Sequence, residues 1–461
     1  MENRTEPALI WDGKDKESED NDFILQEDAD KSYGDPNSGN LLIQGDNLGA
    51  LHALAKEYSG KIKCAYLDPP YNTGSTFDHY DDSISHCQWL SFMKNRLIAV
   101  KELLKPDGVI VVQIGFDEMA YLKVLMDEVF GREKCIGQIA VRMSHSAGMK
   151  RRAMDRRMIK NTEYILMYYR SVQPKLNPIY EPCSEYPVNY YQYITRFPSE
   201  RGDIGEYTNL IDILYDSFES DFKALGLKKT NVSIKTLYSE CNDIREFILK
   251  NKDRVVRKDS NVPTIPEKQI PAGILENECI SVQCSGETYL IGKNHSGNFY
   301  QLYSIASKVK PSSSIGGEDI SEALTNLVGD WWDGFYRDMS RVDIEGGVKM
   351  KTSKKPERLI SRILSAVTSE SDIVLDPFVG SGTTAAAALK MNRRFIAIEL
   401  GNQILSLCLP RLKNVIDGKD HTGITHSFDW KGGSGFTFFS CACGEHSCGE
   451  HSCGGQVARK I

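Results

Sequence analysis

The stretch LLIQGDNLGALHALAKEYSGKIKCAYLDPPYNTG, residues 41–74, holds the pattern of an α/β protein. A short apolar strand comes first, and a helix capped by Asn47 or Asp46 follows it. The next apolar run, Ile62 to Leu67, predicts a buried strand that ends at Asp68. Two prolines come directly after that aspartate, and proline has no N–H for a ladder hydrogen bond. We therefore expect a stiff loop, headed by a carboxylate, at the mouth of a sheet.

The alternation of strands and helices returns on both sides of a different central stretch. The expected strands cover residues 41–46, 62–67, 109–115, 162–170, 372–378 and 394–400, and the expected helices cover residues 47–58, 86–105, 117–130, 356–368 and 382–391. Such alternation predicts the α/β class with a mostly parallel, doubly wound sheet. The central stretch is rich in tyrosine and predicts an amphipathic helix over 207–225 and a hairpin within 287–303. We interpret it as an inserted domain.

Five segments follow from this pattern. They are an acidic lead-in over 1–40, one half of the α/β domain over 41–172, the insertion over 173–340, the other half over 341–436 and a tail over 437–461. The tail repeats the sequence GEHSC, but the spacing of its cysteines and histidines is not that of a zinc finger, and no apolar core surrounds them. We expect a disordered tail and no metal site.

Charge is unevenly distributed along the 461 residues. The net charge is −7, and the lead-in alone carries −8, so the other 421 residues sum to about +1. Two dense basic runs, 150–160 and 250–258, suit phosphate contacts, although a solvated surface explains either run equally well. The candidate phosphate contacts are Lys150, Arg151, Arg152, Arg156 and Arg157, with Arg196 in the insertion.

The cysteines and the apolar runs bear on the cellular compartment. Eight of the twelve cysteines are scattered singly or nearly so, which favours reduced thiols over a disulfide framework. No apolar run approaches the length of a membrane span, and the N-terminal residues have no basic-then-apolar signal pattern. We expect a cytoplasmic protein without a membrane partner.

A glycine-rich turn follows the strand that ends at Asp376. Gly380 and Gly382 let the backbone come close to a ligand, and a helix begins near Thr383. Glu399 ends the next strand, where an acid accepts the hydroxyls of an adenosine ribose. The turn therefore predicts a nucleoside cofactor. Nowhere does the sequence hold the G-x-x-x-x-G-K-[ST] motif, which argues against a phosphate-loop ATP site.

The loop after the strand at 62–67 suits chemistry on a nucleobase amino group, which is a poor nucleophile because its lone pair is delocalised into the ring. Asp68 accepts one N–H hydrogen bond, and the carbonyl of Pro69, stiffened by Pro70, accepts the other. Tyr71 offers a ring on which a flipped base stacks. Together these groups favour a pyramidal nitrogen whose lone pair points at an electrophile.

These two motifs resemble those of the amino-group DNA methyltransferases that use S-adenosylmethionine. The sequence DPPY at 68–71 is typical of N6-adenine enzymes, whereas N4-cytosine enzymes more often carry serine in place of the aspartate. The catalytic loop precedes the glycine motif at 376–383, with the insertion between them, which resembles the β group. The stretches NLLIQGDNLGAL, YLDPPYNTGSTF, EGGVKMKTSKKPERLI and NRRFIAIEL are similar to the modification subunit of type III restriction–modification systems.

The resemblance implies a Rossmann-like methyltransferase fold with S-adenosylmethionine as the cofactor, and it makes the insertion the target-recognition domain. The implied cofactor-binding residues are Asp376, Phe378, Gly380, Gly382, Thr383, Glu399, Lys355 and Asp46, with Lys355 near the methionine end of the cofactor. The implied partners are double-stranded DNA, a second copy of the chain, and a separately encoded restriction subunit with helicase and nuclease activity. The chain is short for a modification subunit. The stretch GGSGFTFF, residues 432–439, resembles the closing strand of that family, and the tail after it matches no segment of the family.

We thus predict a site-specific DNA adenine-N6 methyltransferase with Asp68, Pro69, Pro70 and Tyr71 as catalytic residues. An N4-cytosine or RNA methyltransferase on the same scaffold stays open as an alternative. So does a DNA-specificity subunit that acts mainly with a restriction partner. C5-cytosine methylation is disfavoured, because the one Pro-Cys pair, at 182–183, lacks the rest of that motif.

Overall fold

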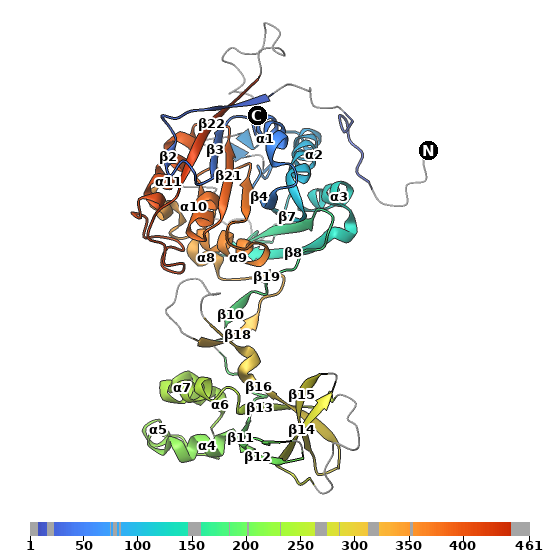
Figure 1. Ribbon diagram of the computed structural model, residues 1–461, viewed down its shortest axis with the longest axis vertical. Helices are drawn as coiled ribbons and strands as arrows, with labels where there is room; N and C mark the ends of the chain where they lie inside the picture. The colour runs from blue at the N-terminus through green and yellow to red at the C-terminus, as the bar shows by residue number, and fades with distance from the viewer. Residues whose placement is uncertain are drawn as a thin grey trace. The chain divides into compact units, whose positions relative to one another are not determined.

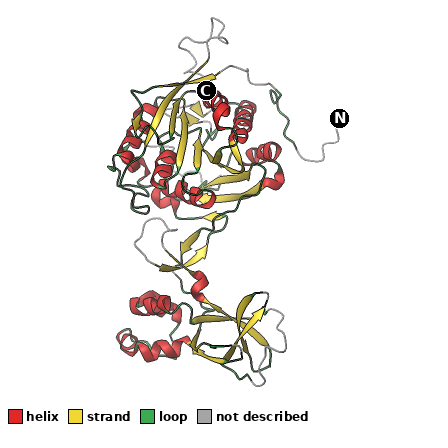
Figure 2. Ribbon diagram, viewed as in Figure 1, coloured by secondary structure: helices red, strands yellow, loops and turns green. Residues whose placement is uncertain are grey.

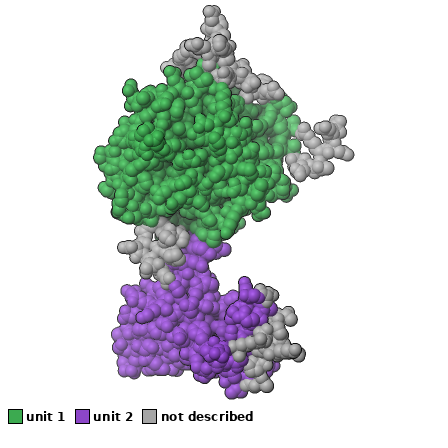
Figure 3. Space-filling view, in the orientation of Figure 1, with its two compact units in different colours: residues 1–179, 328–461 green, residues 180–327 purple. Residues whose placement is uncertain are grey.

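The computed structural model divides into two compact units. Unit 1 is Met1–Ile179 with Val328–Ile461, and unit 2 is Tyr180–Leu327 (Figure 3). The described residues are 8–15, 23–73, 75–76, 81–82, 84–145, 158–183, 185–200, 202–230, 232–262, 274–284, 286–311, 322–350 and 354–443.

Unit 1 is built on one mixed sheet of eleven strands (Figure 1). The strands are β1 (Phe23–Glu27), β2 (Tyr33–Gly34), β3 (Leu41–Gln44), β4 (Ile62–Leu67), β7 (Leu104–Ile114), β8 (Cys135–Arg142), β9 (Thr162–Tyr169), β19 (Trp331–Trp332), β20 (Ile373–Asp376), β21 (Arg394–Glu399) and β22 (Gly435–Cys443). Their order is β1-β22-β3-β21-β20-β4-β7-β9-β8-β19, and β2 pairs with β22. Neighbours from β22 to β7 are parallel, whereas β1 and β9 run antiparallel to their neighbours. The predicted mostly parallel α/β sheet is confirmed.

Helices cover both faces of this sheet (Figure 2). They are α1 (Asn47–Tyr58), α2 (His86–Leu103), α3 (Met119–Phe130), α8 (Phe335–Asp338), α9 (Glu357–Val367), α10 (Thr383–Lys390) and α11 (Leu409–Ile416), with short turns η1 (Arg132–Lys134), η6 (Val342–Gly347) and η7 (Ile404–Cys408). Alternate strand residues divide the core: Tyr66 and Val111 join the cluster with α9 and α10, and Leu67 and Val112 join the cluster with α1 and α2. Within the described ranges no helix is long and apolar enough to cross a membrane.

Strands from the two ends of the chain complete the sheet. β22 lies between β3 and β1, with Phe438 opposite Leu42 on one side and Cys441 opposite Leu25 on the other. The expected tail over 437–461 is therefore wrong at its start. Residues 437–439 lie in the closing strand that the family resemblance implies, and 440–443 continue that strand opposite β1. The rest of that tail lies outside the described residues. β1 lies within the lead-in, where the sequence showed only weak patterning.

Unit 2 contains a closed six-stranded barrel, a small sheet and four helices. The barrel strands, in spatial order, are β11 (Gln192–Arg196), β12 (Ile204–Asn209), β14 (Glu278–Cys284), β15 (Glu287–Lys293), β16 (Phe299–Ser304) and β13 (Val255–Asp259). The small sheet holds β10 (Tyr180–Pro182), β18 (Glu322–Leu327) and β17 (Val309–Pro311), and the helices are α4 (Leu210–Ser217), α5 (Glu219–Ala224), α6 (Ile234–Glu240) and α7 (Asn242–Lys250), with the turn η4 (Ile305–Lys308). β15 and β16 form the hairpin that the sequence predicted.

The single helix expected over 207–225 is wrong. Tyr207 to Asn209 belong to β12, where the Tyr207 ring is buried in the barrel core. The helical part is then interrupted at Phe218, whose backbone dihedrals of φ −134° and ψ 38° separate α4 from α5. Phe218 packs edge-on against Phe247 of α7, so a tertiary contact outweighs the continuous helical pattern.

Candidate active site

The carboxyl ends of the central strands of unit 1 bring the predicted motifs together. β4 and β20 are parallel neighbours, with Ala65 opposite Leu375, so Asp68 and Asp376 both lie at the same edge of the sheet. β21, which ends at Glu399, is the next strand along. Ligand sites of open α/β sheets form at this edge, outside the carboxyl ends of the strands. The geometry makes this edge the candidate active site.

The loop after β4 is held at both ends by side chains from other elements. The indole Nε1 of Trp89 on α2 donates a 2.8 Å hydrogen bond to the carbonyl oxygen of Pro70. Asn72, in the left-handed region with φ 54°, donates from Nδ2 to Glu118 Oε1 at 2.8 Å. Because Pro69 and Pro70 also restrict the backbone, the loop is fixed before any ligand arrives.

Asp68 presents one paired and one unpaired carboxylate oxygen. Its Oδ2 lies 2.9 Å from the ammonium of Lys355. Its Oδ1 is buried and has no hydrogen-bond partner among the residues that the structure describes. Burial raises the pKa of Asp68, while the positive charge of Lys355 opposes that rise. A buried acceptor without a donor is rare in folded proteins, so Oδ1 is a natural acceptor for a ligand N–H.

The Tyr71 ring is fixed by contacts on several sides. Its hydroxyl donates a 2.8 Å hydrogen bond to Glu163 Oε2, and the Lys355 ammonium lies 4.9 Å from its ring centroid. Gly115 lies against the ring, because a Cβ built there would come within 3.0 Å of Tyr71 Cδ2. The structure therefore brings Asp68, Tyr71 and Lys355 together.

The glycine turn after β20 adopts a conformation that favours glycine. Gly380 has φ 51° and Gly382 has φ 84°. A Cβ at Gly382 would lie 2.8 Å from the Cys408 sulfur, whereas a Cβ at Gly380 would meet only the Phe378 carbonyl oxygen, at 3.9 Å. The turn is therefore packed against the protein at Gly382 and open at Gly380, which is the cradle that a bound nucleoside needs.

Two acids flank the glycine turn. Asp376 is buried, which raises its pKa to about 7, although hydrogen bonds from Thr384 and from the Phe378 backbone N–H oppose the rise. Glu399 Oε2 accepts from the Gly380 N–H at 2.9 Å, and its Oε1 accepts from the Gly401 N–H at 3.0 Å. Gln403 Nε2 also donates to Glu399 Oε1 at 2.9 Å, so Glu399 ties the glycine turn to the loop after β21.

The predicted cofactor contacts Asp46 and Phe378 are the chain neighbours of two hydrogen-bonded residues, Asn47 and Pro377. Asp46 caps α1 by accepting from the Gly49 N–H at 3.1 Å and pairs with Arg96 at 3.1 Å. Asn47 donates from Nδ2 to the Pro377 carbonyl oxygen at 2.9 Å, beside Phe378. The described contacts of Asp46 are those of a helix cap, and the bond that reaches the glycine turn comes from its neighbour Asn47.

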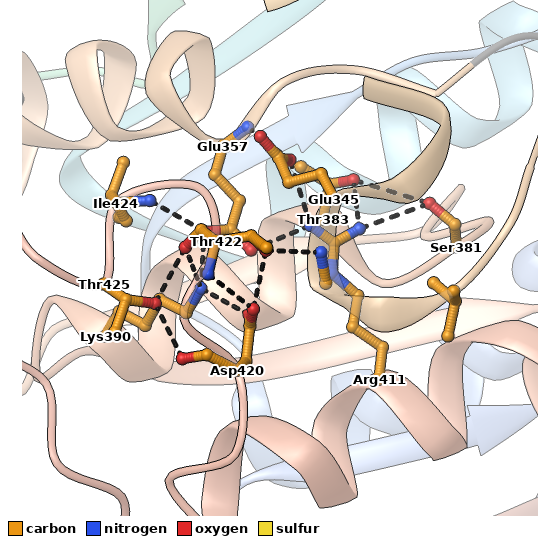
Figure 4. A network of polar contacts seen from close by, with 12 residues as sticks. Glu345, Glu357, Ser381, Thr383, Lys390, Arg411, Asp420, Thr422, Ile424 and Thr425 are labelled. Carbon is orange, nitrogen blue, oxygen red and sulfur yellow. Dashed lines mark hydrogen bonds and ion pairs between the residues drawn. The ribbon is translucent and has the colours of Figure 1, made fainter. Parts of the chain in front are cut away.

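A buried charge network lies behind the glycine turn (Figure 4). Arg411 on α11 donates to Thr383 Oγ1 at 2.8 Å and to Glu357 Oε1 at 2.8 Å. Lys390 on α10 donates to Glu357 Oε2 at 2.7 Å and to Asp420 Oδ2 at 2.6 Å. The network joins α9, α10 and α11, and it fixes the first residue of α10, Thr383. The spacing of strands and helices along the sequence does not reveal this network.

Sequence reasoning also missed Glu163 and Gln113, which lie on neighbouring strands. Glu163 accepts from Tyr71 in the loop after β4, and Gln113 donates to Glu163. Gln113 Nε2 donates to Glu163 Oε2 at 2.6 Å, and the Tyr66 hydroxyl donates to Gln113 Oε1 at 2.7 Å. The sequence signal for Glu163 and Gln113 is a charged or amide side chain within an otherwise apolar strand. That signal is weak without knowledge of the strand order.

The predicted DNA contacts are only partly described. Lys150, Arg151, Arg152, Arg156 and Arg157 lie outside the described residues. Arg196 on β11 pairs with Asp203 and Glu206, each at 3.3 Å. Within the described part of the chain, no group of three or more His, Cys, Asp or Glu residues is placed to hold a metal ion.

Comparisons with known proteins place this geometry in a family. The family described as DNA methylase (N6_N4_Mtase) matches residues 62–409, about three quarters of the chain. A probable type III restriction-modification enzyme HindVI Mod subunit from Haemophilus influenzae is 34% identical over 87% of this chain and 54% of the relative. The type II methyltransferase M.KpnI from Klebsiella pneumoniae is 26% identical over 80% of this chain and 81% of the relative.

Other relatives are more distant. The EcoP15I Mod subunit of a type III restriction-modification enzyme from Escherichia coli is 25% identical over 79% of this chain and 59% of the relative. The chain thus spans just over half the length of the two Mod subunits. Among solved structures, the cytosine-N4-specific PvuII DNA methyltransferase matches with a TM-score of 0.37 and 14% identity, over 85% of this chain and 92% of that chain. The match over residues 62–409 shows that this chain belongs to the N6/N4 DNA methylase family.

Proposed function

We propose that the chain is a site-specific methyltransferase that modifies the N6 amino group of adenine in double-stranded DNA, as the modification component of a restriction–modification system. The observation that carries the proposal is Asp68. Its Oδ1 is buried and unpaired among the described residues, and it lies beside the fixed ring of Tyr71. An aspartate at the head of the loop favours adenine over cytosine, in line with the sequence resemblance.

The cofactor of this reaction is S-adenosylmethionine, which supplies an electrophilic methyl group when bound. The open backbone at Gly380 fits a nucleoside, and Glu399, at the end of the neighbouring strand, places a carboxylate where the ribose hydroxyls would lie. Asp376, Phe378, Gly382, Thr383, Lys355 and Asp46 complete the proposed set. Of these, Gly382 and Thr383 contribute by fixing the backbone of the turn, because Gly382 packs against Cys408 and Thr383 accepts from Arg411.

The residues of the loop prepare the target nitrogen. Asp68 Oδ1 accepts one N–H of the amino group, and the Pro69 carbonyl oxygen accepts the other, so the nitrogen becomes pyramidal and its lone pair is available. Tyr71 stacks on the flipped base. Lys355 holds Oδ2, and its positive charge opposes the rise in the pKa of Asp68 that burial causes.

DNA recognition is assigned to unit 2 and to the basic run at 150–157. On the barrel, Tyr191 is exposed and the Arg254 guanidinium lies 5.2 Å from the Phe197 ring centroid, a pairing of aromatic and basic groups that suits nucleic acid. The names of the HindVI and EcoP15I relatives designate them as Mod subunits of restriction enzymes. We accordingly propose a separate restriction subunit as partner, and a dimer of this chain.

The test is a labelling experiment. The protein is incubated with methyl-labelled S-adenosylmethionine and unmodified bacterial DNA, the DNA is digested to nucleosides, and the labelled base is identified. We expect N6-methyladenine with the wild type and none with Asp68→Asn. The matched control is Asp107→Asn, which breaks another aspartate–lysine pair, 2.6 Å from Lys63, at the opposite edge of the sheet. Label in N4-methylcytosine, or label only when RNA replaces the DNA in the same incubation, would refute the adenine-DNA assignment.

A further inference from the structure

Glu163 brings a second carboxylate to the catalytic loop from an unexpected direction. It is the second residue of β9, which runs antiparallel to β7, so the beginning of β9 lies beside the end of β7. The side chain is partly buried, and its Oε2 accepts from the Tyr71 hydroxyl at 2.8 Å and from Gln113 Nε2 at 2.6 Å. The mechanism proposed above does not use this residue.

Glu163 and Asp68 lie on either side of one ammonium group. The Lys355 nitrogen is 2.9 Å from Asp68 Oδ2 and 3.7 Å from Glu163 Oε2. Glu163 is already stabilised by two donors, Tyr71 and Gln113, and therefore leaves the closer contact with Lys355 to Asp68. The arrangement keeps Lys355 on one oxygen of Asp68 and leaves the other oxygen unpaired.

Glu163 is the acceptor in both of its hydrogen bonds. The Tyr71 hydroxyl and the Gln113 amide both donate to its Oε2. The Gln113 carbonyl oxygen then faces the Tyr66 hydroxyl, which donates to it at 2.7 Å. A chain of three bonds thereby runs from the buried strand β4 to the ring of Tyr71, and Glu163 sets its polarity.

We propose that Glu163 is a positioning residue for methyl transfer: through the Tyr71 hydroxyl it fixes the ring that receives the target base, and through Lys355 it keeps that ammonium on Asp68. The inference rests on the proposed function of the Asp68 loop. Glu163 touches neither the base nor the reacting atoms, so its effect passes through Tyr71 and Lys355.

The first arm of the test measures turnover. Glu163→Gln keeps the size of the side chain but removes the charge, and Tyr71→Phe keeps the ring but removes the hydroxyl. We expect kcat for DNA methylation to fall at least tenfold in Glu163→Gln, with the Kd for S-adenosylmethionine unchanged within twofold. Tyr71→Phe added to Glu163→Gln should cost less than it does alone, because both act through one hydrogen bond. Glu27→Gln, an exposed glutamate on β1, is the matched control.

The second arm reads the charge of the site without cofactor or DNA. The groups that act on Asp68 are Lys355, Glu163 and Tyr71, and Asp68 in turn acts on Tyr66 and Asp376. The negative charge of Glu163 raises the pKa of Asp68, so Glu163→Gln should lower it. Carboxyl-carbon NMR of aspartate-labelled protein measures this pKa, with the Asp68 signal assigned by its loss in Asp68→Asn. The acidic limb of the kcat profile should move to lower pH by the same amount.

The outcomes separate the two proposals. Unchanged kcat and an unchanged Asp68 pKa in folded Glu163→Gln overturn the role of Glu163, whatever base the wild type methylates. Lost cofactor binding or unfolding in Glu163→Gln, with full activity in Tyr71→Phe, also overturns it and leaves Glu163 a stabilising residue. A wild type that methylates no adenine refutes the proposed function, and the NMR titration then still decides whether Glu163 acts on Asp68.

Discussion

Replacing Lys390 by methionine tests the buried network behind the glycine turn. The Lys390 side chain is fully buried, and its ammonium lies 2.7 Å from Glu357 and 2.6 Å from Asp420. Methionine keeps most of the length of the apolar stem but removes the charge and the three donors. Glu357 still pairs with Arg411 at 2.8 Å, so the loss falls mainly on Asp420.

The expected cost follows from that uncompensated carboxylate. Removing one partner of a buried ion pair costs about 3–5 kcal/mol, and the surviving Arg411 contact places Lys390→Met near the lower end, about 3 kcal/mol. Burial alone would raise the pKa of Asp420, but Lys390 and Thr422 hold it below its ordinary value. A group with a lowered folded pKa stabilises above its unfolded pKa and loses that contribution as the pH falls through the folded value. The difference between wild type and variant should therefore shrink below about pH 4.

Urea unfolding followed by tryptophan fluorescence is the assay, because all five tryptophans lie in unit 1. The control is Lys419→Met, which breaks a pair with Asp417 at 2.7 Å at the surface and should leave the free energy of unfolding nearly unchanged. If Lys390→Met unfolds within about 1 kcal/mol of this control at pH 7, the reasoning about buried charge is wrong.

Three further predictions concern the site itself. Gly382→Ala should destabilise unit 1 and weaken cofactor binding more than Gly380→Ala, because only at Gly382 does the new methyl group meet a packed neighbour in addition to a positive φ; calorimetry of both variants measures this. Asp376 has a folded pKa of about 7, above its ordinary value of 3.8. Between pH 3.8 and pH 7 the carboxyl is therefore protonated in the folded protein and ionised in the unfolded chain. Stability should thus fall as the pH rises from 4 to 7, and Asp376→Asn should remove that fall and stabilise the protein at pH 8, as thermal unfolding would show. Trp89→Phe removes the hydrogen bond to Pro70 and should lower kcat while the Kd for S-adenosylmethionine stays unchanged; equal loss in both would contradict a role confined to the loop.

The candidate site was predictable where it depends on strand ends. Asp68, Asp376 and Glu399 each follow or end an apolar run, and parallel strands bring such ends to one edge. Glu163 was not predictable, because it begins its strand, and only the antiparallel direction of β9 brings it to that edge. A sequence pattern shows that a strand exists but not which way it runs.

The fold was also predictable where it depends on local sequence. The prediction failed where a strand forms by pairing with segments far away in the sequence. The buried strands β4, β7 and β20 can be recognised from their apolar composition. In contrast, β22 becomes a strand because β3 and β1, some four hundred residues away, flank it. The helix expected over 207–225 failed because the barrel takes Tyr207 into its core. These contacts have no signature within a short window of sequence.

The position of β22 between β3 and β1 has a consequence for synthesis on the ribosome. β3 leaves the exit tunnel early, yet its two partners, β21 and β22, are made more than three hundred residues later. Until then β3 exposes unpaired backbone groups on both of its edges, which are templates for aggregation. Unit 2, whose strands all lie within Tyr180–Leu327, completes its barrel while the surrounding sheet still waits for its last strands. A chain that terminates before the end of β22 therefore has a complete unit 2, whereas the sheet of unit 1 is incomplete.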